Sequence, residues 1–320
     1  MLIVQKFGGS SLADGERLRH VAELCLSGRA REAELVLVVS AMGDATDRLS
    51  RSAREVSPAP PKRELDALVT TGEQQAAALL VMAMQELGLD AVSLTGWQAG
   101  ILTDGAYGAG EIRLVAPGRI REELSRGRIP VVTGFQGICA RGDVTSLGRG
   151  GSDTTAVALA AALEAERCEI YTDVDGIYTA DPRLLPDARL LREIDYRDML
   201  RLARAGSQVL HPGSVRLAMD TGLPVHLLSS FRAGEGSLVR ALSEAERPAL
   251  VGVTRDEARS TVTVVGRAAD SGLREELSRQ LEQCGIPVRG SSEEEGCVTL
   301  TVAPAQLLPA LELCHRAVIG

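Results

Sequence analysis

The chain has 320 residues, 45% of them apolar, and a net charge of −8, so it can form a large folded core and two domains. It contains no run of about 18 apolar residues and no leader pattern, so we expect a cytoplasmic protein with no membrane partner. The acidic net charge argues against a nucleic-acid partner. The six cysteines form no CxxC pair, which is typical of buried thiols in a reducing compartment.

The first predicted strand, residues 2–7, ends in a Gly-Gly-Ser-Ser turn that leads into a helix over about 13–26. Glycines before a helix let backbone N–H groups approach a phosphate. The turn is not a P-loop, because Lys6 precedes the glycines, and no G-x-G-x-x-G fingerprint is present. An ordinary tight turn therefore explains Gly8 and Gly9 about as well as a phosphate cradle does.

Lysine is rare in this chain: Lys6 and Lys62 are the only lysines among 35 basic residues. An ammonium group is a compact point charge, whereas a guanidinium group is a planar fork, so the two are not interchangeable. Lys6 stands at the end of the first strand beside the glycines, which favours a functional role. Lys62 follows a Pro-rich loop and precedes a predicted helix, where a solvated side chain is the simpler interpretation.

Further apolar runs predict buried strands of a mostly parallel sheet, and most of them end in polar loops. Ligands bind at the carboxyl ends of such strands. The segment 104–111 between two of them is Gly-rich and predicts a hairpin tip. These strands cover residues 35–39, 91–94, 129–135, the run that ends at Thr172, and 223–228.

Glu73 lies in the first turn of a predicted helix that runs from Thr70 to about Leu87. A carboxylate there is stabilised by the helix dipole, which accounts for it without any ligand. The alternative is a carboxylate that holds a substrate ammonium group.

The stretch from Thr145 to Thr155 reads TSLGRGGSDTT and precedes an Ala-rich helical run. Its glycines allow backbone N–H groups to approach an anion, and Arg149 adds a fork of donors suited to a carboxylate or phosphate. Ser152 or Asp153 is predicted as the N-cap of the helix. The stretch therefore predicts an anion site that contains one acidic residue.

After residue 231 the pattern weakens, and we expect a boundary between domains there. The remaining segments predict a small antiparallel α+β domain, with strands at 261–265, 286–289 and 297–302 and helices at 273–284 and 306–314. Its exposed sheet edge could pair with a second copy of the chain. Two histidines outside this domain are interpreted as structural: His211 as a cap or turn residue and His226 as a core residue.

The loops, taken together and in order, resemble the motif set of the aspartokinase branch of the amino acid kinase family. The resemblance spans about residues 1–230. Its motifs are KFGGSS at 6–11, SAMGD at 40–44, TGE at 71–73, GFQG at 134–137, TSLGRGGSD at 145–153 and TDVDGIYTADPR at 172–183.

This resemblance implies an α/β protein with an amino acid kinase fold, a central mostly parallel sheet between helices, followed by a small ACT-like α+β domain. We expect a catalytic domain at 1–232, a linker at 233–247, and a regulatory or dimerisation domain at 248–320. A homodimer or higher homo-oligomer formed through the ACT-like domain is implied.

The implied reaction transfers the γ-phosphoryl group of ATP to the β-carboxylate of L-aspartate, giving 4-phospho-L-aspartate, the first step toward lysine, threonine and methionine. The attacking group is already a carboxylate, so no general base is required. Catalysis then consists of positioning and stabilisation of negative charge. Mg²⁺ is expected to arrive with ATP and to need few protein ligands.

The resemblance also implies a role for each matching residue. Lys6 would neutralise charge on the transferring phosphoryl group, and Asp153 would orient Lys6. Glu73 would lie near the substrate ammonium group and Arg149 on a carboxylate. The implied aspartate ligands are Ser40, Thr46, Glu73, Arg149 and Ser152, and the implied nucleotide ligands are Lys6, Gly8, Gly9, Ser10, Thr172, Asp173, Tyr178 and Arg183.

Three features depart from the family pattern. Gln208 stands where many relatives have a second nucleotide-side lysine, and Tyr107 and Glu111 replace the usual His and Arg of a hairpin. The C-terminal region has room for one ACT module, whereas the family typically has two. That module also lacks the usual Pro-Gly after its first strand and has Asp-Ser-Gly at 270–272.

Two other functions remain open at this point. The chain could phosphorylate another acidic amino acid, such as glutamate or N-acetylglutamate, in a specialised pathway. Glu73 and Arg149 together favour a free α-amino acid over an acetylated one. The chain could also be a non-catalytic amino-acid-binding subunit, although the presence of both Lys6 and Asp153 argues against this.

The single, altered ACT module predicts weak or no feedback inhibition by lysine or threonine, because effectors of the family bind at interfaces between ACT modules. An inhibition titration with each amino acid measures this directly. Strong inhibition at physiological effector concentrations would contradict the prediction.

Overall fold

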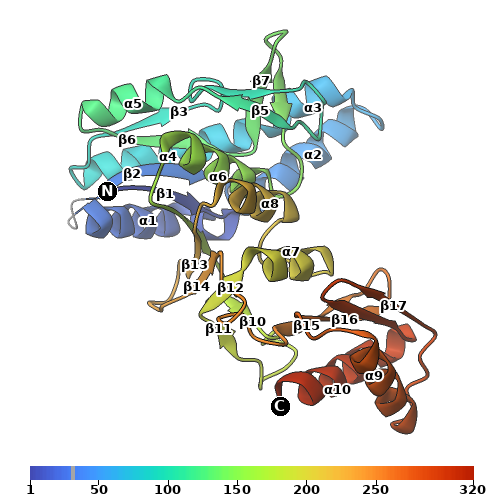
Figure 1. The fold of residues 1–320 in the computed structure, drawn as a ribbon. Helices are drawn as coiled ribbons and strands as arrows, with labels where there is room; N and C mark the ends of the chain where they lie inside the picture. The colour runs from blue at the N-terminus through green and yellow to red at the C-terminus, as the bar shows by residue number, and fades with distance from the viewer. Residues whose placement is uncertain (30–32) are drawn as a thin grey trace. The chain divides into compact units, whose positions relative to one another are not determined.

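The computed structural model describes residues 1–29 and 33–320, which form two compact units (Figure 1). Unit 1 consists of Met1–Asp175 and Leu223–Gly234, and unit 2 consists of Gly176–Gly222 and Glu235–Gly320. The expected catalytic domain, linker and ACT-like domain do not coincide with these units, because the segment 176–222 groups with the C-terminal residues. The three-part division at residues 232 and 247 remains a prediction.

Unit 1 is built on parallel strands: β1 Leu2–Phe7, β2 Glu34–Val39, β3 Ala91–Leu94, β6 Ile129–Thr133, β9 Arg167–Thr172 and β13 Val225–Ser229. Their order in the sheet is β13-β9-β1-β2-β6-β3, and every neighbouring pair is parallel. The apolar runs form these strands because both faces of the sheet are covered. The predicted α/β fold with a central parallel sheet is confirmed.

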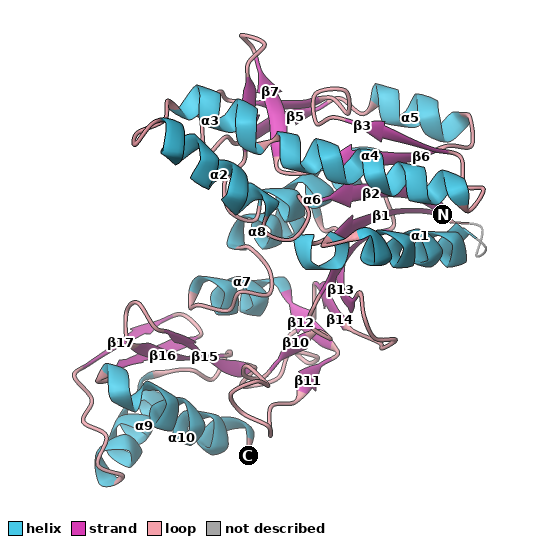
Figure 2. Cartoon of the chain, turned by 180° about the vertical axis from the view of Figure 1, so that it is seen from behind, coloured by secondary structure: helices cyan, strands magenta, loops and turns pink. Residues whose placement is uncertain are grey.

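Helices cover both faces of this sheet: α1 Gly15–Arg29 and α4 Thr71–Glu86 on one face, and α6 Gly151–Leu163 on the other. Figure 2 shows α1 and α4 in front of β1, β2 and β6. Side chains of a strand alternate between faces, so Ile3 and Phe7 enter the core beneath α1 and α4. The same alternation directs Lys6 toward α6.

A second, smaller sheet of unit 1 has the order β5-β4-β7-β8. The antiparallel pairing of β4 with β5 confirms the hairpin predicted around 104–111. The remaining elements of unit 1 are β4 Ile101–Thr103, β5 Ile112–Val115, β7 Gln136–Cys139, β8 Val144–Ser146, η1 Gly9–Leu12, α2 Ala45–Val56, α3 Lys62–Val69 and α5 Gly118–Ser125.

Unit 2 contains a four-stranded antiparallel sheet of β15 Gly252–Asp256, β16 Thr261–Val265, β17 Gly290–Glu294 and β18 Cys297–Thr301, packed with the helices α9 Ser271–Gln283 and α10 Leu307–Ile319. This is the predicted small α+β fold. Its other elements are β10 Ile177–Tyr178, β11 Leu190–Leu191, β12 Glu193–Asp195, β14 Ser237–Arg240, α7 Tyr196–Arg204, α8 Pro212–Thr221 and η2 Pro304–Gln306.

Several element predictions were wrong in detail. The strand expected at 286–289 forms instead at Gly290–Glu294, although all five of its residues are exposed. Ile286 is buried, and its N–H donates to the carbonyl of Leu281 at the end of α9, so the apolar run closes the helix. The strand expected to reach Phe135 ends at Thr133, and the expected linker contains β14.

The caps and cysteines give mixed outcomes. His211 is the N-cap of α8, as predicted, and its side chain accepts a hydrogen bond from the N–H of Gly213. Asp270 caps α9 in the same way through the N–H of Leu273, which explains the Asp-Ser-Gly sequence there.

Four of the six cysteines are buried, but Cys284 is exposed and Cys297 half-buried. Within the described residues, no helix is long and apolar enough to cross a membrane.

Asp66 of α3 is a buried carboxylate that the sequence did not single out. It accepts hydrogen bonds from the N–H of Gly108 at 2.9 Å and from the N–H and hydroxyl of Ser146 at 3.0 and 2.7 Å. These bonds tie α3 to the β4–β5 hairpin and to the end of β8, directly before the Gly-rich loop.

Asp66→Ala should lower the free energy of unfolding by about 2–4 kcal/mol, because it leaves the two buried donors of Ser146, and the N–H of Gly108, without this acceptor. Chemical denaturation measures the change. Glu64→Ala on the same helix is the matched control, since its exposed ion pair with Arg63 should contribute less than about 1 kcal/mol. Equal effects of the two substitutions would contradict this role for Asp66.

Candidate active site

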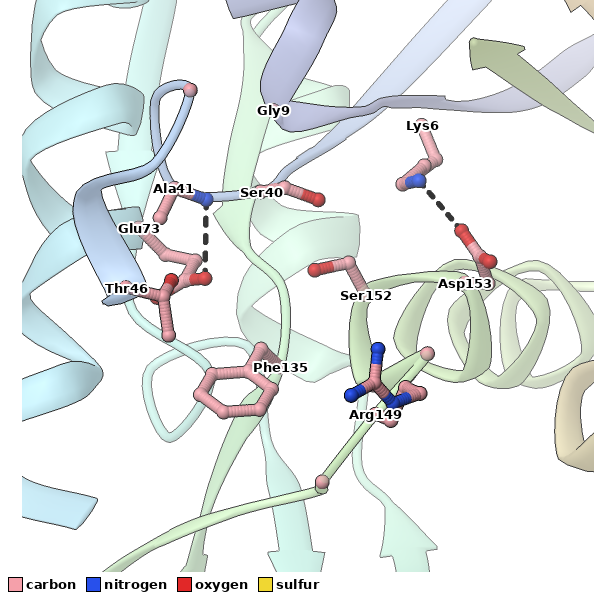
Figure 3. A pocket seen from close by; sticks show the side chains of 14 residues that line it. Lys6, Gly9, Ser40, Ala41, Thr46, Glu73, Phe135, Arg149, Ser152 and Asp153 are labelled. Atoms are coloured by element: carbon pink, nitrogen blue, oxygen red, sulfur yellow. Dashed lines mark hydrogen bonds and ion pairs between the residues drawn. The ribbon is translucent and has the colours of Figure 1, made fainter. Parts of the chain in front are cut away.

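A pocket of about 320 Å³ lies within unit 1, where β1, β2 and β6 end and α6 begins (Figure 3). This is the edge at which parallel α/β sheets bind ligands. The structure brings all five predicted aspartate ligands together here with Lys6, Gly9 and Asp153. The lining residues are Lys6, Gly9, Ser40, Ala41, Gly43, Thr46, Glu73, Phe135, Gly148, Arg149, Gly150, Gly151, Ser152 and Asp153.

Lys6 and Asp153 form an ion pair across the pocket wall, with 2.6 Å between Lys6 Nζ and Asp153 Oδ1. Lys6 comes from β1 and Asp153 from the first turn of α6. Their side chains are only 11% and 13% exposed, so water screens the pair weakly. The carboxylate therefore holds the ammonium group at one place beside the glycines.

Glu73 lies on the opposite side of the pocket from this pair (Figure 3). It is 3% exposed, and its Oε1 accepts a hydrogen bond from the N–H of Ala41 at 3.1 Å. Its Oε2 is buried and has no hydrogen-bond partner among the described residues. Burial raises the pKa of Glu73 to about 7, against the opposing effect of backbone N–H donors. A cationic ligand would satisfy this oxygen and lower the pKa again.

Arg149 is exposed, and within residues 1–29 and 33–320 its guanidinium group has no ion-pair partner. It stands between Gly148 and Gly150, which both have a φ of +71°. Glycine adopts this left-handed backbone without steric cost, so the loop can turn sharply on both sides of Arg149. The pocket therefore contains one cation that is available to bind an anion.

The prediction that Ser152 or Asp153 caps α6 was wrong. The N-cap is Gly150, and the helix begins at Gly151, so both residues lie in the first turn. Neither side chain caps the helix. Asp153 pairs with Lys6 instead, and Ser152 lines the pocket.

Two glycines allow the loops to approach one another. A Cβ on Gly9 would lie 2.7 Å from the carbonyl oxygen of Ala41, and one on Gly134 would lie 2.7 Å from Ser152 Oγ. Both distances are shorter than a carbon–oxygen contact allows. Close packing therefore requires glycine at position 9. A Cβ on Gly8 would lie 3.6 Å from its nearest neighbours, which is an ordinary contact, so packing does not require glycine there.

The predicted nucleotide ligands are distributed over both units. Thr172 ends β9 in unit 1 and Asp173 follows it, and the Thr172 hydroxyl donates to Asp173 Oδ1 at 3.1 Å. Tyr178 and Arg183 belong to unit 2. Gly8 and Ser10 belong to unit 1 but do not line the pocket.

Sequence reasoning missed Phe135 and Ala41 as members of the site. Phe135 lines the pocket with a φ of +66°, and its N–H donates to Thr155 Oγ1 at 3.2 Å. No sequence pattern predicts a left-handed backbone conformation at a phenylalanine. Ala41 contributes its backbone N–H to Glu73, which depends on the loop conformation alone.

The residues that depart from the family pattern lie outside the pocket. The Tyr107 hydroxyl donates to Asp143 Oδ2 at 2.7 Å, and Glu111 pairs with Arg113 at 3.3 Å. Gln208 is exposed in unit 2. No group of three His, Cys, Asp or Glu side chains in the described part of the chain is arranged to hold a metal ion.

Residues 1–229 match the model of the amino acid kinase family. An aspartokinase of Mycolicibacterium smegmatis is 47% identical over 291 residues, which are 90% of this chain and 69% of that protein. The chain belongs to the aspartokinase branch of the amino acid kinase family.

Solved structures of the branch have the same fold. Aspartate kinase from Synechocystis is 39% identical with a TM-score of 0.69, and the match covers 98% of this chain but only 54% of that one. Aspartokinase III of E. coli, in complex with aspartate and ADP, is 26% identical with a TM-score of 0.72, covering 99% and 84% of the two chains. This member of the branch thus spans about half the length of the Synechocystis enzyme.

Glu73 should reduce stability at high pH. Its pKa is raised from 4.5 to about 7 in the folded state, so folding favours the protonated form, and stability falls as the pH rises through this window. Glu73→Gln should be as stable as the wild type near pH 4.5 and more stable at pH 8, by on the order of 1–3 kcal/mol. Denaturation curves at both pH values, without substrate, measure the difference. A difference that does not change with pH would contradict the raised pKa.

Proposed function

We propose that this protein is an aspartate kinase that transfers the γ-phosphoryl group of ATP to the β-carboxylate of L-aspartate. The observation that carries the proposal is the set of charges in one pocket. Within the described part of the chain, a buried oxygen of Glu73 has no hydrogen-bond partner and Arg149 has no anionic partner, while the ammonium group of Lys6 is held by Asp153. A free amino acid with a second carboxylate complements this set, and the aspartokinase relatives support the assignment.

Substrate binding follows from these charges. The α-ammonium group would bind Glu73 and remove the cost of its buried oxygen. Arg149 would bind a carboxylate, with Ser40, Thr46 and Ser152 as further donors. An N-acetylated substrate has no ammonium group and would leave Glu73 unpaired, so the pocket favours a free α-amino acid.

The reaction needs no general base. A β-carboxylate oxygen attacks the γ-phosphorus, the bond from this phosphorus to the bridging β–γ oxygen breaks, and its electron pair leaves with ADP. The products are 4-phospho-L-aspartate and ADP. Lys6 would neutralise charge that develops on the transferring group, and Asp153 keeps Lys6 in place. The N-terminus of α6, lined by Gly150 and Gly151, adds a favourable potential for anions.

Mg²⁺ would enter with ATP and offset the charge of its phosphates. Of the two acidic residues that line the pocket, Asp153 is already paired with Lys6, and Glu73 is expected to bind the substrate ammonium group. These residues fit a metal ion that is held mainly by phosphate oxygens. Gly8, Gly9, Ser10, Thr172, Asp173, Tyr178 and Arg183 would surround the nucleotide, and the ACT-like domain would form a homo-oligomer.

Lys6→Ala should lower kcat by about 10³-fold, because it removes the positive charge beside the transferring phosphoryl group. The assay supplies ATP, Mg²⁺ and a panel of acidic amino acids, and traps the acyl phosphate with hydroxylamine. Lys62→Ala is the matched control, since this exposed residue is the only other lysine in the chain. It should keep wild-type activity.

L-Aspartate should be the best substrate of the panel. No acyl phosphate from any amino acid would refute the proposed function. Equal loss of activity in the Lys6 and Lys62 variants would refute the role of Lys6.

A further inference from the structure

The hairpin of residues 177–191, here called the nucleotide hairpin, carries two predicted ATP ligands, Tyr178 and Arg183. It consists of β10, β11 and the loop between them, and it lies within unit 2, as does the C-terminal α+β fold. Arg183 forms a two-point ion pair with Asp181 at 3.0 and 2.8 Å, and Asp181 also accepts from the Arg183 N–H. The loop is therefore ordered locally at the residues expected to meet the nucleotide.

Apolar side chains of this loop belong to the C-terminal core. Ala180 and Leu185 are buried in one cluster with Val253, Val262 and Leu311, which come from the sheet and from α10. Burial of this kind stabilises the loop in one position relative to the C-terminal fold.

The backbone reinforces this attachment. The N–H of Val253 on β15 donates to the carbonyl of Thr179 at 2.7 Å. Gly252 permits the approach, since a Cβ on it would lie 2.7 Å from the same carbonyl oxygen. The hairpin thus lies directly against β15 at the residue after Tyr178.

A buried polar pair completes the attachment. Thr179 Oγ1 lies 2.9 Å from Nε2 of His315 on α10, and Thr179 and His315 are 4% and 6% exposed. Thr179 Oγ1 also accepts from the N–H of Arg189 at 3.0 Å, across the base of the loop. Burial, followed by the charge of Arg189, lowers the pKa of His315, while Asp187 acts in the opposite direction. The pair therefore joins both sides of the hairpin base to the last helix of the chain.

We propose that His315 is a positioning residue for the nucleotide: through Thr179 it holds the hairpin that carries Tyr178 and Arg183. The C-terminal fold then holds two of the predicted nucleotide ligands in position, in addition to any role in regulation or assembly. This inference rests on the proposed function. The five predicted aspartate ligands all belong to unit 1, so the effect should be confined to ATP.

The test uses Thr179→Val and His315→Leu, singly and together, in the full-length protein. Each substitution removes the polar contact and replaces the polar side chain by an apolar one of similar size. We expect KM for ATP to rise about 3- to 10-fold, as for the indirect loss of one buried hydrogen bond. KM for aspartate and kcat at saturating ATP should not change. Thr179→Val also removes the acceptor of the Arg189 N–H, so its effect should be the larger one. The double variant should resemble Thr179→Val, because His315 acts through Thr179.

Two controls separate positioning from general loss of stability. Thr263→Val removes a hydroxyl that lies 3.0 Å from Thr299 Oγ1, between two strands of the sheet in the same unit. It should lower the melting temperature and leave KM for ATP unchanged. His315→Gln retains a group that can hydrogen-bond to Thr179, and it should restore KM for ATP to near the wild-type value.

ADP affinity, measured by calorimetry on the same variants, keeps the inference separate from the proposed function. If the wild type binds ADP but phosphorylates no amino acid, the proposed function fails, and weaker ADP binding in the two variants still supports the inference. Unchanged KM for ATP and unchanged ADP affinity in variants with lowered melting temperatures would overturn it. A wild type that binds no ADP would also overturn it, because the hairpin would have no nucleotide to meet.

Discussion

The ion pair between Lys6 and Asp153 is the contact on which the site depends. It joins the end of the first strand to the first turn of α6, and both side chains are largely shielded from water. Removing either partner would leave a shielded charge without compensation, which is strongly unfavourable. The pair also determines which charges of the pocket are already occupied and which remain available to a substrate.

Glu73 and Arg149 are the charges that remain available. The buried oxygen of Glu73 has no hydrogen-bond partner in residues 1–29 and 33–320, and the pKa of Glu73 is raised, so the folded protein carries an energetic cost that a substrate ammonium group would remove. Binding sites commonly lower the stability of the free protein in this way, because their polar groups are placed to bind a ligand and not to satisfy one another. The glycines at 9 and 134 contribute differently, because they allow the loops to approach closely enough for these charges to share one pocket.

The C-terminal fold and the nucleotide hairpin belong to the same compact unit. The hairpin that carries Tyr178 and Arg183 has its apolar side chains in the C-terminal core and its base attached to α10. A segment that resembles part of the kinase in sequence is thus packed as part of the C-terminal fold. This packing explains why the compact units do not follow the predicted domain boundaries.

The sequence by itself determined the class of fold, the parallel strands and most members of the site, because apolar runs and Gly-rich loops are local patterns. It also indicated Lys6, through the rarity of lysine. Only the tertiary structure decided that Gly150 and not Ser152 caps α6, that Phe135 adopts a left-handed backbone, and that an exposed segment forms β17 in place of the apolar run before it. It alone revealed Asp66, the unpaired oxygen of Glu73 and the Thr179–His315 contact. Each of these depends on atoms that are distant in sequence, and no local pattern records which of them meet.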